Sequence, residues 1–478
     1  MERLFKVLAG IWLVLTTAAY ASDVEQEVIS KVIKAYGGES LTSMKSLIVR
    51  DRYKTITRDG GVRPGLDAVS RLHSTLIIDY VHGRKSVKNW RVDATGKRLG
   101  QIMFDGTSGW SINYLRGSHV MREDLTHKRV GAGMMRLLDT TLVRLLTDAV
   151  DTANYEGQTT LLGRVHDKLS FKINGSVDVT LYIDNTTGLI TQMERTNGVH
   201  YVYSEHRIKD GITYASDTNQ FRHGRPATIT LSREIEVNPD VSKAFILPKD
   251  TKPLEGMRDV SKMQVKTIGE DVYLVGKGVR SSIFVDTGDY FIAAGSLSGF
   301  EARMKAVNEK IGAEKSVRYF VVPEHHPGHM GDIKKIATMG VQFVTVDSHL
   351  LSLKKRIGNE LSDDRFILVD GVLDLADGKV QLHDISTITS EHFLLFYIPG
   401  TKLVYTMDEF GANLLNSVPS ADKRMLSFRD AIEAIDIDVQ QFAHVHGTGV
   451  LTLEQFRQVT DAYQEGFCPD GHTICAEY

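Results

Sequence analysis

The sequence predicts a protein of two parts, in which a curved antiparallel β-sheet with helices precedes a layered α/β fold. The chain has 478 residues, more than one hydrophobic core usually organises. From Leu47 onward, β-like segments are separated by turn signals such as Asp105-Gly106 and Asn197-Gly198. From residue 260 onward, strand and helix patterns alternate, which is typical of layered α/β proteins.

Residues 1–21 have the pattern of a secretory signal peptide. The basic residues Arg3 and Lys6 precede a short apolar run, and the small residues Ala19 and Ala21 fit a cleavage site. The apolar run is shorter than a typical membrane-spanning helix requires. We therefore expect a periplasmic or secreted protein with no stable membrane span after cleavage. An uncleaved, membrane-tethered form is the alternative.

Residues 22–250 predict one helix followed mostly by strands. The opening helix carries apolar residues at helical spacing, namely Val24, Val28, Val32 and Tyr36. The segment from Val177 to Ile183 alternates as a half-buried strand does. A second helical pattern interrupts the strands at Met134, Leu138, Leu142 and Leu145. These patterns predict a curved antiparallel sheet with a helix packed against one face.

Three turn phrases in this part carry a resemblance to a known family. They are Leu181 to Asp184, Thr187 to Ile190 and Asp210 to Ile212. Together with the order of the elements, they resemble periplasmic outer-membrane lipoprotein carrier-like domains over residues 22–248. The resemblance implies a half-open sheet that cradles acyl chains in an apolar groove. A structural or partner-docking domain is the alternative.

Residues 251–259 predict a linker to the second part, which covers residues 260–467. Strands are expected at Asp271 to Val275, Ser282 to Asp286, Tyr290 to Ala293, Tyr319 to Val322 and Val341 to Val346. One helix among them can be capped by Ser298 and closed by Gly312, and another spans Asp332 to Met339.

The stretch that follows the expected strand at Tyr319 to Val322 is rich in histidine. Six residues of it hold three of the chain's seventeen histidines and a carboxylate: Glu324, His325, His326 and His329. Open α/β sheets place their binding crevices at the C-terminal ends of their strands. Imidazole and carboxylate groups gathered at such a place predict a metal site.

The run at residues 320–333 resembles the metal-binding loop of the metallo-β-lactamase superfamily, whose pattern is His-x-His-x-Asp-His before a glycine-led helix. Two later phrases fall in the family's order: a strand pair that ends at Asp408, and the loop His446-Gly447. The resemblance covers residues 260–464 and implies an αββα sandwich.

The chain departs from the family's pattern at several positions. Glu324 stands for the first histidine of the loop, His326 for the second, Gly328 for the aspartate and His329 for the last. No histidine occupies residues 386–390, where the family supplies another ligand. The resemblance therefore implies an incomplete two-metal site.

The metal ligands that the resemblance implies are His326, His329, Asp408 and His446. His329, Asp408 and His446 would suffice to hold one zinc ion and leave a position for water. His326 and Glu324 would complete a weak neighbouring site or orient the ligands. Because glycine cannot position the attacking water, Glu324 or Glu391 would take that catalytic role.

The function implied is zinc-dependent hydrolysis of an ester, thioester, lactone or related bond in a small-molecule or acyl-bearing substrate. The competing hypothesis is a non-catalytic periplasmic protein that binds a hydrophobic ligand or a partner. No Gly-x-Ser-x-Gly elbow and no Gly-x-Gly-x-x-Gly after a strand favours another enzyme class. A net charge of −3 gives no reason to expect nucleic acid as a partner.

The two cysteines of the chain, Cys468 and Cys475, lie in a predicted tail at residues 468–478. In an oxidising compartment they predict a disulfide. The alternative is that they bind a metal ion with His472, but the Cys-x-x-Cys pairs of closed zinc sites are missing.

Overall fold

The computed structural model describes residues 23–254, 262–277, 280–296, 298–358, 361–411, 421–446 and 449–465. The predicted signal peptide, the predicted pairing of Cys468 with Cys475 and residues 255–259 of the predicted linker lie outside the described residues. Among the described residues, no helix is both long and apolar enough to cross a membrane.

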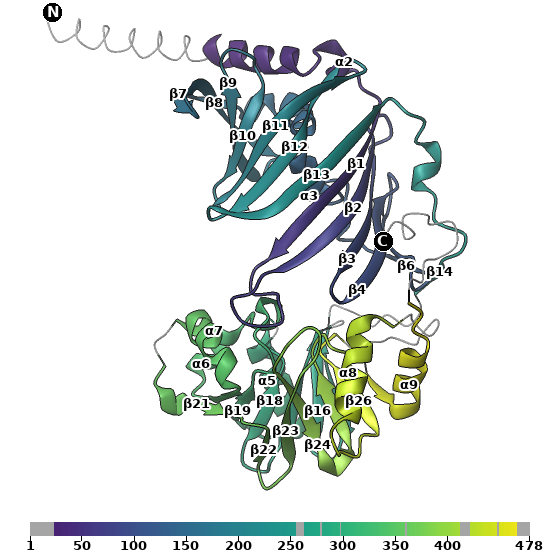
Figure 1. The fold of residues 1–478 in the computed structure, drawn as a ribbon, viewed down its shortest axis with the longest axis vertical. Coiled ribbons are helices and arrows are strands. Elements are labelled where there is room, and N and C mark those ends of the chain that lie inside the picture. Colours follow the sequence, from purple (N-terminus) through teal and green to yellow (C-terminus); the bar gives the residue numbers. More distant parts are fainter. Residues whose placement is uncertain are drawn as a thin grey trace, which may run out of the picture.

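Within the described residues, the first part is built on one sheet of fourteen strands, which occupies the upper half of Figure 1. The order is β14-β6-β5-β4-β3-β2-β1-β13-β12-β11-β10-β9-β8-β7. Neighbouring strands pair antiparallel except for β14 and β6, which are parallel. The strands are β1 (Ser46–Thr57), β2 (Ala68–Asp79), β3 (Arg84–Asp93), β4 (Gly96–Phe104), β5 (Gly109–Asn113), β6 (Ser118–Met121), β7 (Asn154–Leu161), β8 (Arg164–Ile173), β9 (Val177–Asp184), β10 (Ile190–Arg195), β11 (Val199–Lys209), β12 (Ile212–Arg222), β13 (Arg225–Val237) and β14 (Lys252–Pro253).

Helices pack against this sheet through one apolar core. Residues 23–35 are helical, and short helices follow as α2 (Glu39–Thr42), α3 (Ala132–Leu137), α4 (Asp139–Thr147) and the 3₁₀ turns η1 (Val150–Thr152) and η2 (Ser242–Phe245). The core joins Val32 and Leu142 of the helices to Leu181 and Tyr201 of the strands. The predicted second helical segment is two helices, because Leu138 between them is extended, with φ −112° and ψ 113°. The likeness to lipoprotein carriers stays a prediction.

Lys85 on β3 is a buried cation in this sheet. Its side chain is only 3% exposed, and among the described residues its hydrogen-bond partner is Met135 Sδ, at 3.4 Å. Burial lowers the pKa of the Lys85 ammonium group from 10.5 to about 8. The folded state therefore disfavours the charged form, which the unfolded chain retains up to its ordinary pKa.

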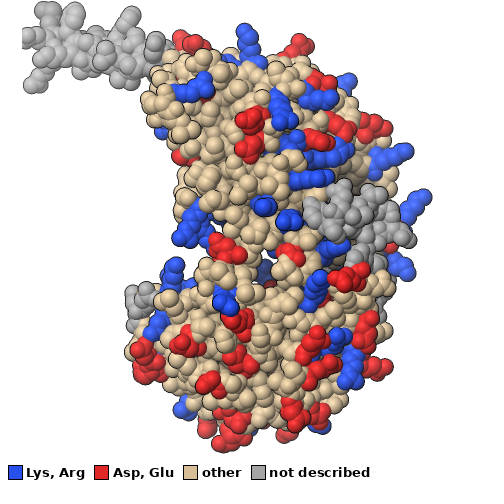
Figure 2. Space-filling model, viewed as in Figure 1, with Lys and Arg blue, Asp and Glu red and all other residues tan. Residues whose placement is uncertain are grey.

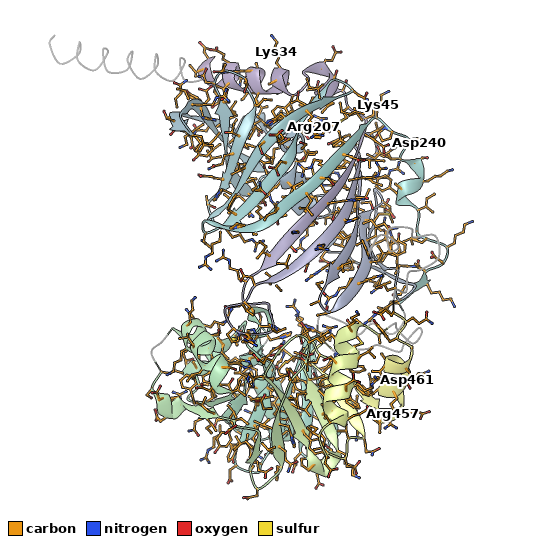
Figure 3. All side chains as sticks on the ribbon, viewed as in Figure 1. Lys34, Lys45, Arg207, Asp240, Arg457 and Asp461 are labelled. Atoms are coloured by element: carbon orange, nitrogen blue, oxygen red, sulfur yellow. The ribbon has the colours of Figure 1, made fainter. Side chains whose placement is uncertain are left out.

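We expect Lys85→Met to stabilise the fold by about 3 kcal/mol at pH 7, the free-energy equivalent of this pKa shift. Above pH 8 Lys85 is already neutral in the folded state, whereas the unfolded chain keeps the proton up to about 10.5, so the gain shrinks as the pH rises from 8 to 10.5 and vanishes above it. Urea unfolding at pH 7 and pH 10.5 measures both values. Lys45→Met is the control, because Lys45 is exposed beside the start of β1 (Figure 3). Equal stability of wild type and Lys85→Met at pH 7 would contradict the expectation.

The second part contains two smaller sheets among the described residues. The seven-stranded sheet comprises, in order, β15 (Met263–Gly269), β16 (Val272–Lys277), β17 (Arg280–Asp286), β18 (Phe291–Ala294), β19 (Val317–Val321), β20 (Gln342–Thr345) and β21 (Phe366–Leu368). The six-stranded sheet comprises β22 (Val372–Leu375), β23 (Val380–Ile385), β24 (Phe393–Ile398), β25 (Leu403–Thr406), β26 (Gln441–His444) and β27 (Val450–Thr452).

The two sheets pack face to face with helices outside them, in the lower half of Figure 1. Alternate residues of β18 show why: Ile292 joins the core between the sheets, and Phe291 joins the core under the helices. The helices are α5 (Phe300–Ile311), α6 (Ile333–Thr338), α7 (Asp347–Ile357), α8 (Lys423–Glu433) and α9 (Leu453–Asp461), and the remaining 3₁₀ turns are η3 (Pro327–His329), η4 (Asp363–Arg365) and η5 (Pro399–Thr401). The first three helices pack on the seven-stranded sheet, and α8 and α9 pack against β24 and β26. This is a helix–sheet–sheet–helix order.

The prediction that Ser298 caps the helix at residues 300–311 is wrong. Gly299 stands at the cap position, and the backbone N–H groups of Gly299 and Phe300 donate to Asp332 Oδ2 at 2.6 and 2.9 Å. The carboxylate comes from the end of the histidine-rich loop, which the fold brings against the helix start. The cap therefore ties α5 to that loop.

Candidate metal centre

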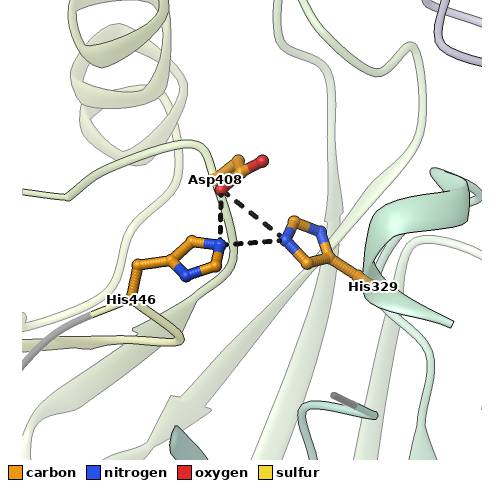
Figure 4. A group of neighbouring side chains, drawn as sticks. All are labelled: His329, Asp408 and His446. Carbon is orange, nitrogen blue, oxygen red and sulfur yellow. Dashed lines mark hydrogen bonds and ion pairs between the residues drawn. The ribbon is translucent and has the colours of Figure 1, made fainter. Parts of the chain in front are cut away.

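His329, Asp408 and His446 meet at one edge of the two sheets (Figure 4). Asp408 and His446 follow β25 and β26, which are parallel neighbours in which Thr406 pairs with His444. Each ligand lies two residues beyond that pair, so the register places the two side chains together. His329 ends the turn η3, in the loop that follows β19 of the other sheet.

The distances among these three side chains suit a single small cation. His446 Nε2 lies 3.2 Å from Asp408 Oδ1, His329 Nε2 lies 3.6 Å from the same oxygen, and the two Nε2 atoms are 3.4 Å apart. Ligand atoms of a tetrahedral zinc ion, each about 2.0–2.2 Å from the metal, lie roughly 3.3–3.5 Å from one another. The three residues therefore fit one zinc ion without rearrangement.

One side of the group is buried and the other is open. The His329 side chain is 7% exposed, whereas the side chains of Asp408 and His446 are 47% and 39% exposed. Burial raises the pKa of the Asp408 carboxyl, but its hydrogen bonds with His329 and His446 lower it far more, so the group is a carboxylate. Solvent or a small molecule can reach the group from the open side.

Glu324 contacts two histidines of the loop, His326 and His329, through its two carboxylate oxygens. Its side chain is 1% exposed, its Oε1 accepts a hydrogen bond from His329 Nδ1, and its Oε2 lies 2.7 Å from His326 Nδ1. Burial lowers the pKa values of both imidazoles, but the charge of Glu324 raises them more, to about 10 for His329 and about 9 for His326. Glu324 therefore contacts both rings at their Nδ1 atoms and can orient them. The opposite nitrogen of His329, Nε2, faces Asp408 and His446.

We expect Glu324→Gln to weaken zinc binding by about 10- to 100-fold, the usual effect of losing a carboxylate that orients a histidine ligand. Competition against a chromophoric chelator measures the affinity. Glu301→Gln is the control, because Glu301 is exposed in the first turn of α5. If Glu324→Gln and wild type bind zinc equally well, Glu324 has no role in orienting the ligand.

The predicted ligand His326 is not part of the group. Its Nε2 lies 3.3 Å from the carbonyl oxygen of Gly61, and His325 Nε2 lies 3.0 Å from the same oxygen. Gly61 belongs to the β1–β2 loop (residues 58–67), which reaches from the first sheet to the second part (Figure 1). A backbone carbonyl oxygen thus lies within hydrogen-bonding distance of both rings.

The β1–β2 loop also engages Glu391, the other predicted catalytic residue. The Glu391 N–H donates to Val62 O at 2.9 Å, and the Glu391 carboxylate forms an ion pair with Arg63. Among the described residues, no recorded contact joins the Glu391 side chain to the three-residue group. Gly328 is exposed with open space around its Cα. Among the described residues, the group that could hold a metal ion comprises His329, Asp408 and His446, and neither Glu391 nor Glu324 is a member of it.

Two further residues beside the centre escaped the sequence analysis. Glu409 is fully buried, its Oε1 accepts from the Thr389 hydroxyl, and burial and the charge of Glu324 raise its pKa to about 7. Arg424 on α8 pairs with Asp422 at 3.0 Å, and its charge helps to lower the pKa of Asp408. The position of Glu409 directly after the ligand Asp408 is a sequence signal that could identify it. No sequence pattern indicates Arg424.

No model of a protein family and no curated protein matches the sequence. Solved structures of metallo-β-lactamases do match. The DIM-1 metallo-β-lactamase is 14% identical with a TM-score of 0.33, covering 42% of this chain and 96% of its own. An enzyme from Hirschia baltica is 12% identical with a TM-score of 0.32, covering 43% and 100%. FIM-1 from Pseudomonas aeruginosa, in a mono-zinc form, is 14% identical with a TM-score of 0.31, covering 43% and 97%. At these values the likeness concerns the fold of part of the chain and carries no argument about its activity.

Proposed function

We propose that this protein is a hydrolase that uses one zinc ion to cleave an ester, thioester, lactone or related bond. The observation that carries the proposal is the group of three ligand atoms, 3.2–3.6 Å apart, on the open edge of the second part. The set of two imidazoles and one carboxylate is one that catalytic zinc sites use. A zinc ion held by these three residues would keep a position for water, and Asp408 and His446 are exposed to solvent.

His329, Asp408 and His446 would hold the ion. The chemistry that zinc supplies when bound is Lewis-acid polarisation of a carbonyl group and acidification of water. Asp408 contributes the negative charge that the cation needs, and Glu324 holds His329 with its Nε2 toward the site. The half-exposed side chains of Asp408 and His446 leave room for a substrate carbonyl to approach.

We further propose that residues 1–21 direct export to the periplasm or beyond, and that the first part holds the acyl portion of the substrate. The pattern of Arg3, Lys6, Ala19 and Ala21 supports the first proposal. The long antiparallel sheet with helices on one face supports the second, since such sheets offer a face for an apolar ligand.

The second candidate is a non-catalytic binding protein. The contact of Gly61 O with His326 favours it, because the chain's own backbone then engages the histidine that would serve a neighbouring metal site. This candidate and the hydrolase predict different metal contents and different activities.

The deciding experiment is elemental analysis of the purified protein after dialysis against zinc, with hydrolysis of 4-nitrophenyl butyrate, a thioester and a lactone measured in parallel. We expect about one zinc ion per chain. We also expect hydrolysis of at least one substrate class to be lost on chelation and restored by zinc. Protein that carries no stoichiometric zinc, iron or manganese after metal loading would rule out the hydrolase.

A further inference from the structure

A groove of about 830 Å³ lies where the first part meets the second. One wall is formed by β4, β5 and the turn after β5, and the other by the start of α8 and residues 463–465. On the face drawn in Figure 2, the surface is hollowed between the two parts, with both basic and acidic side chains beside the hollow. The groove is therefore built from both parts of the chain.

Cationic side chains outnumber acidic ones in the lining. The cations are Lys97, Arg98, Arg116, Lys423 and Arg424, and the acids are Asp93, Asp422 and Glu465. Every acid is already engaged by another group: Asp93 pairs with Arg91 at 2.9 Å, Asp422 pairs with Arg424 and caps α8, and Glu465 pairs with Lys423 at 3.3 Å. The surplus of positive charge is carried by Lys97, Arg98 and Arg116.

These three cations form no direct ion pair with a carboxylate in the part of the chain that the structure describes, although Asp93 and Asp422 act electrostatically on Arg98 and Asp422 acts on Arg116. No side-chain hydrogen bond is recorded for Lys97 or Arg98 among these residues, and the Arg116 guanidinium group donates to the carbonyl oxygen of Gly411, at 3.4 Å. Burial and the charge of Arg424 lower the pKa of the Arg98 guanidinium group, while the charges of Asp93 and Asp422 raise it. Arg98 is exposed at the groove and Arg116 is half-buried, so solvent and small anions can reach both side chains. Like charges gathered in one groove repel one another, and a bound anion relieves that repulsion.

Two residues connect the groove with the metal centre, Gly411 and Arg424. Gly411, which Arg116 contacts, lies three residues after the ligand Asp408. Arg424 lines the groove and also acts electrostatically on Asp408 and Glu409. An anion held by Arg98 and Arg116 would therefore share the groove with Arg424, whose charge acts on the ligand Asp408.

We propose that this groove binds an anionic oxygen group of the substrate, a carboxylate, phosphate or sulfate, and that Arg98 and Arg116 are its ligands. The planar guanidinium fork suits each of these groups, since it can donate two parallel hydrogen bonds. The substrate would then carry its anion at a fixed distance from the bond that is cleaved. That the bound anion is part of a substrate rests on the proposed hydrolase activity. That the groove binds an anion rests on the groove alone.

The first test measures binding without catalysis. Isothermal titration uses benzoate, phenyl phosphate and phenyl sulfate as probes, and benzamide as the neutral control, on wild type and on His329→Ala. We expect at least one anion, and not benzamide, to bind both proteins. Arg98→Gln and Arg116→Gln should each weaken that binding about 10- to 100-fold, as expected for lost charged hydrogen bonds. Arg207→Gln, far from the groove on β11 (Figure 3), should bind as wild type does.

The second test measures substrate preference in the zinc-loaded protein. We expect 4-nitrophenyl hemisuccinate to have at least a tenfold lower KM than 4-nitrophenyl butyrate, and Arg98→Gln to abolish that preference. Anion binding without hydrolysis of any ester would support the groove and overturn the hydrolase. Hydrolysis with no anion binding and no preference would overturn the groove and leave the hydrolase standing. Circular dichroism of each variant confirms that its fold is retained.

Discussion

Replacing His329 by alanine is expected to abolish stoichiometric zinc binding and to lower any hydrolytic kcat/KM by more than about 100-fold, the upper end for loss of a contact that merely orients a ligand. The reason is geometric. His329 is the buried member of the group and the member that comes from the other sheet, so without it only two half-exposed ligands remain. Two ligands cannot build the three-residue site that catalytic zinc uses.

Elemental analysis and zinc titration measure this loss directly, and kinetics on the best substrate of the panel measure the second effect. His383→Ala is the matched control, because His383 lies on β23 with its ring near Tyr397, at a centroid distance of 6.4 Å. It should keep its zinc. If His329→Ala retains one zinc per chain, the ligands are other residues and the proposed centre is wrong.

The second large effect concerns the stability of the first part. Arg233 on β13 faces Asp51 on β1, and the two side chains are 0% and 2% exposed. Arg233 Nε and Nη2 donate to Asp51 at 2.8 and 2.9 Å, and Nη1 donates to Ala215 O and to the Thr218 hydroxyl, each at 2.9 Å. Each of the three guanidinium nitrogens therefore has a hydrogen-bond partner inside the sheet.

We expect Arg233→Met to lower the free energy of unfolding by about 3–5 kcal/mol, because it leaves the Asp51 carboxylate buried without a counter-charge. The double variant Asp51→Leu/Arg233→Met should recover much of that loss, since no unpaired charge remains. Urea unfolding measures all three proteins.

The neighbouring ion pair between Arg50 and Glu236 provides the control for this prediction. Its side chains are 47% and 46% exposed, so Arg50→Met should cost less than about 1 kcal/mol. Equal losses for Arg50→Met and Arg233→Met would show that burial of the pair is not the cause.

Much of the secondary structure follows from local side-chain periodicity. The alternation from Val177 to Ile183 corresponds to β9, and the apolar runs at Tyr319 and Val341 correspond to β19 and β20. Such patterns act over a few residues, because each strand or helix must turn its apolar side toward a core. The local pattern fails where a group from a distant part of the chain takes part. The first N–H groups of α5 donate to Asp332, and not to Ser298 as the local pattern predicts.

The sequence carries the ligand types of the candidate centre, since His329, Asp408 and His446 are among the residues that the resemblance of its motifs implies as metal ligands. Only the folded chain decides which selected residues meet. His326 is two residues from Glu324 along the chain, yet the β1–β2 loop, more than 250 residues away, gives it Gly61 O as a partner. Pairing across such distances depends on how sheets pack, and no local pattern encodes it. The same reason hides the groove of Arg98 and Arg116, whose residues come from elements that are neighbours only after folding.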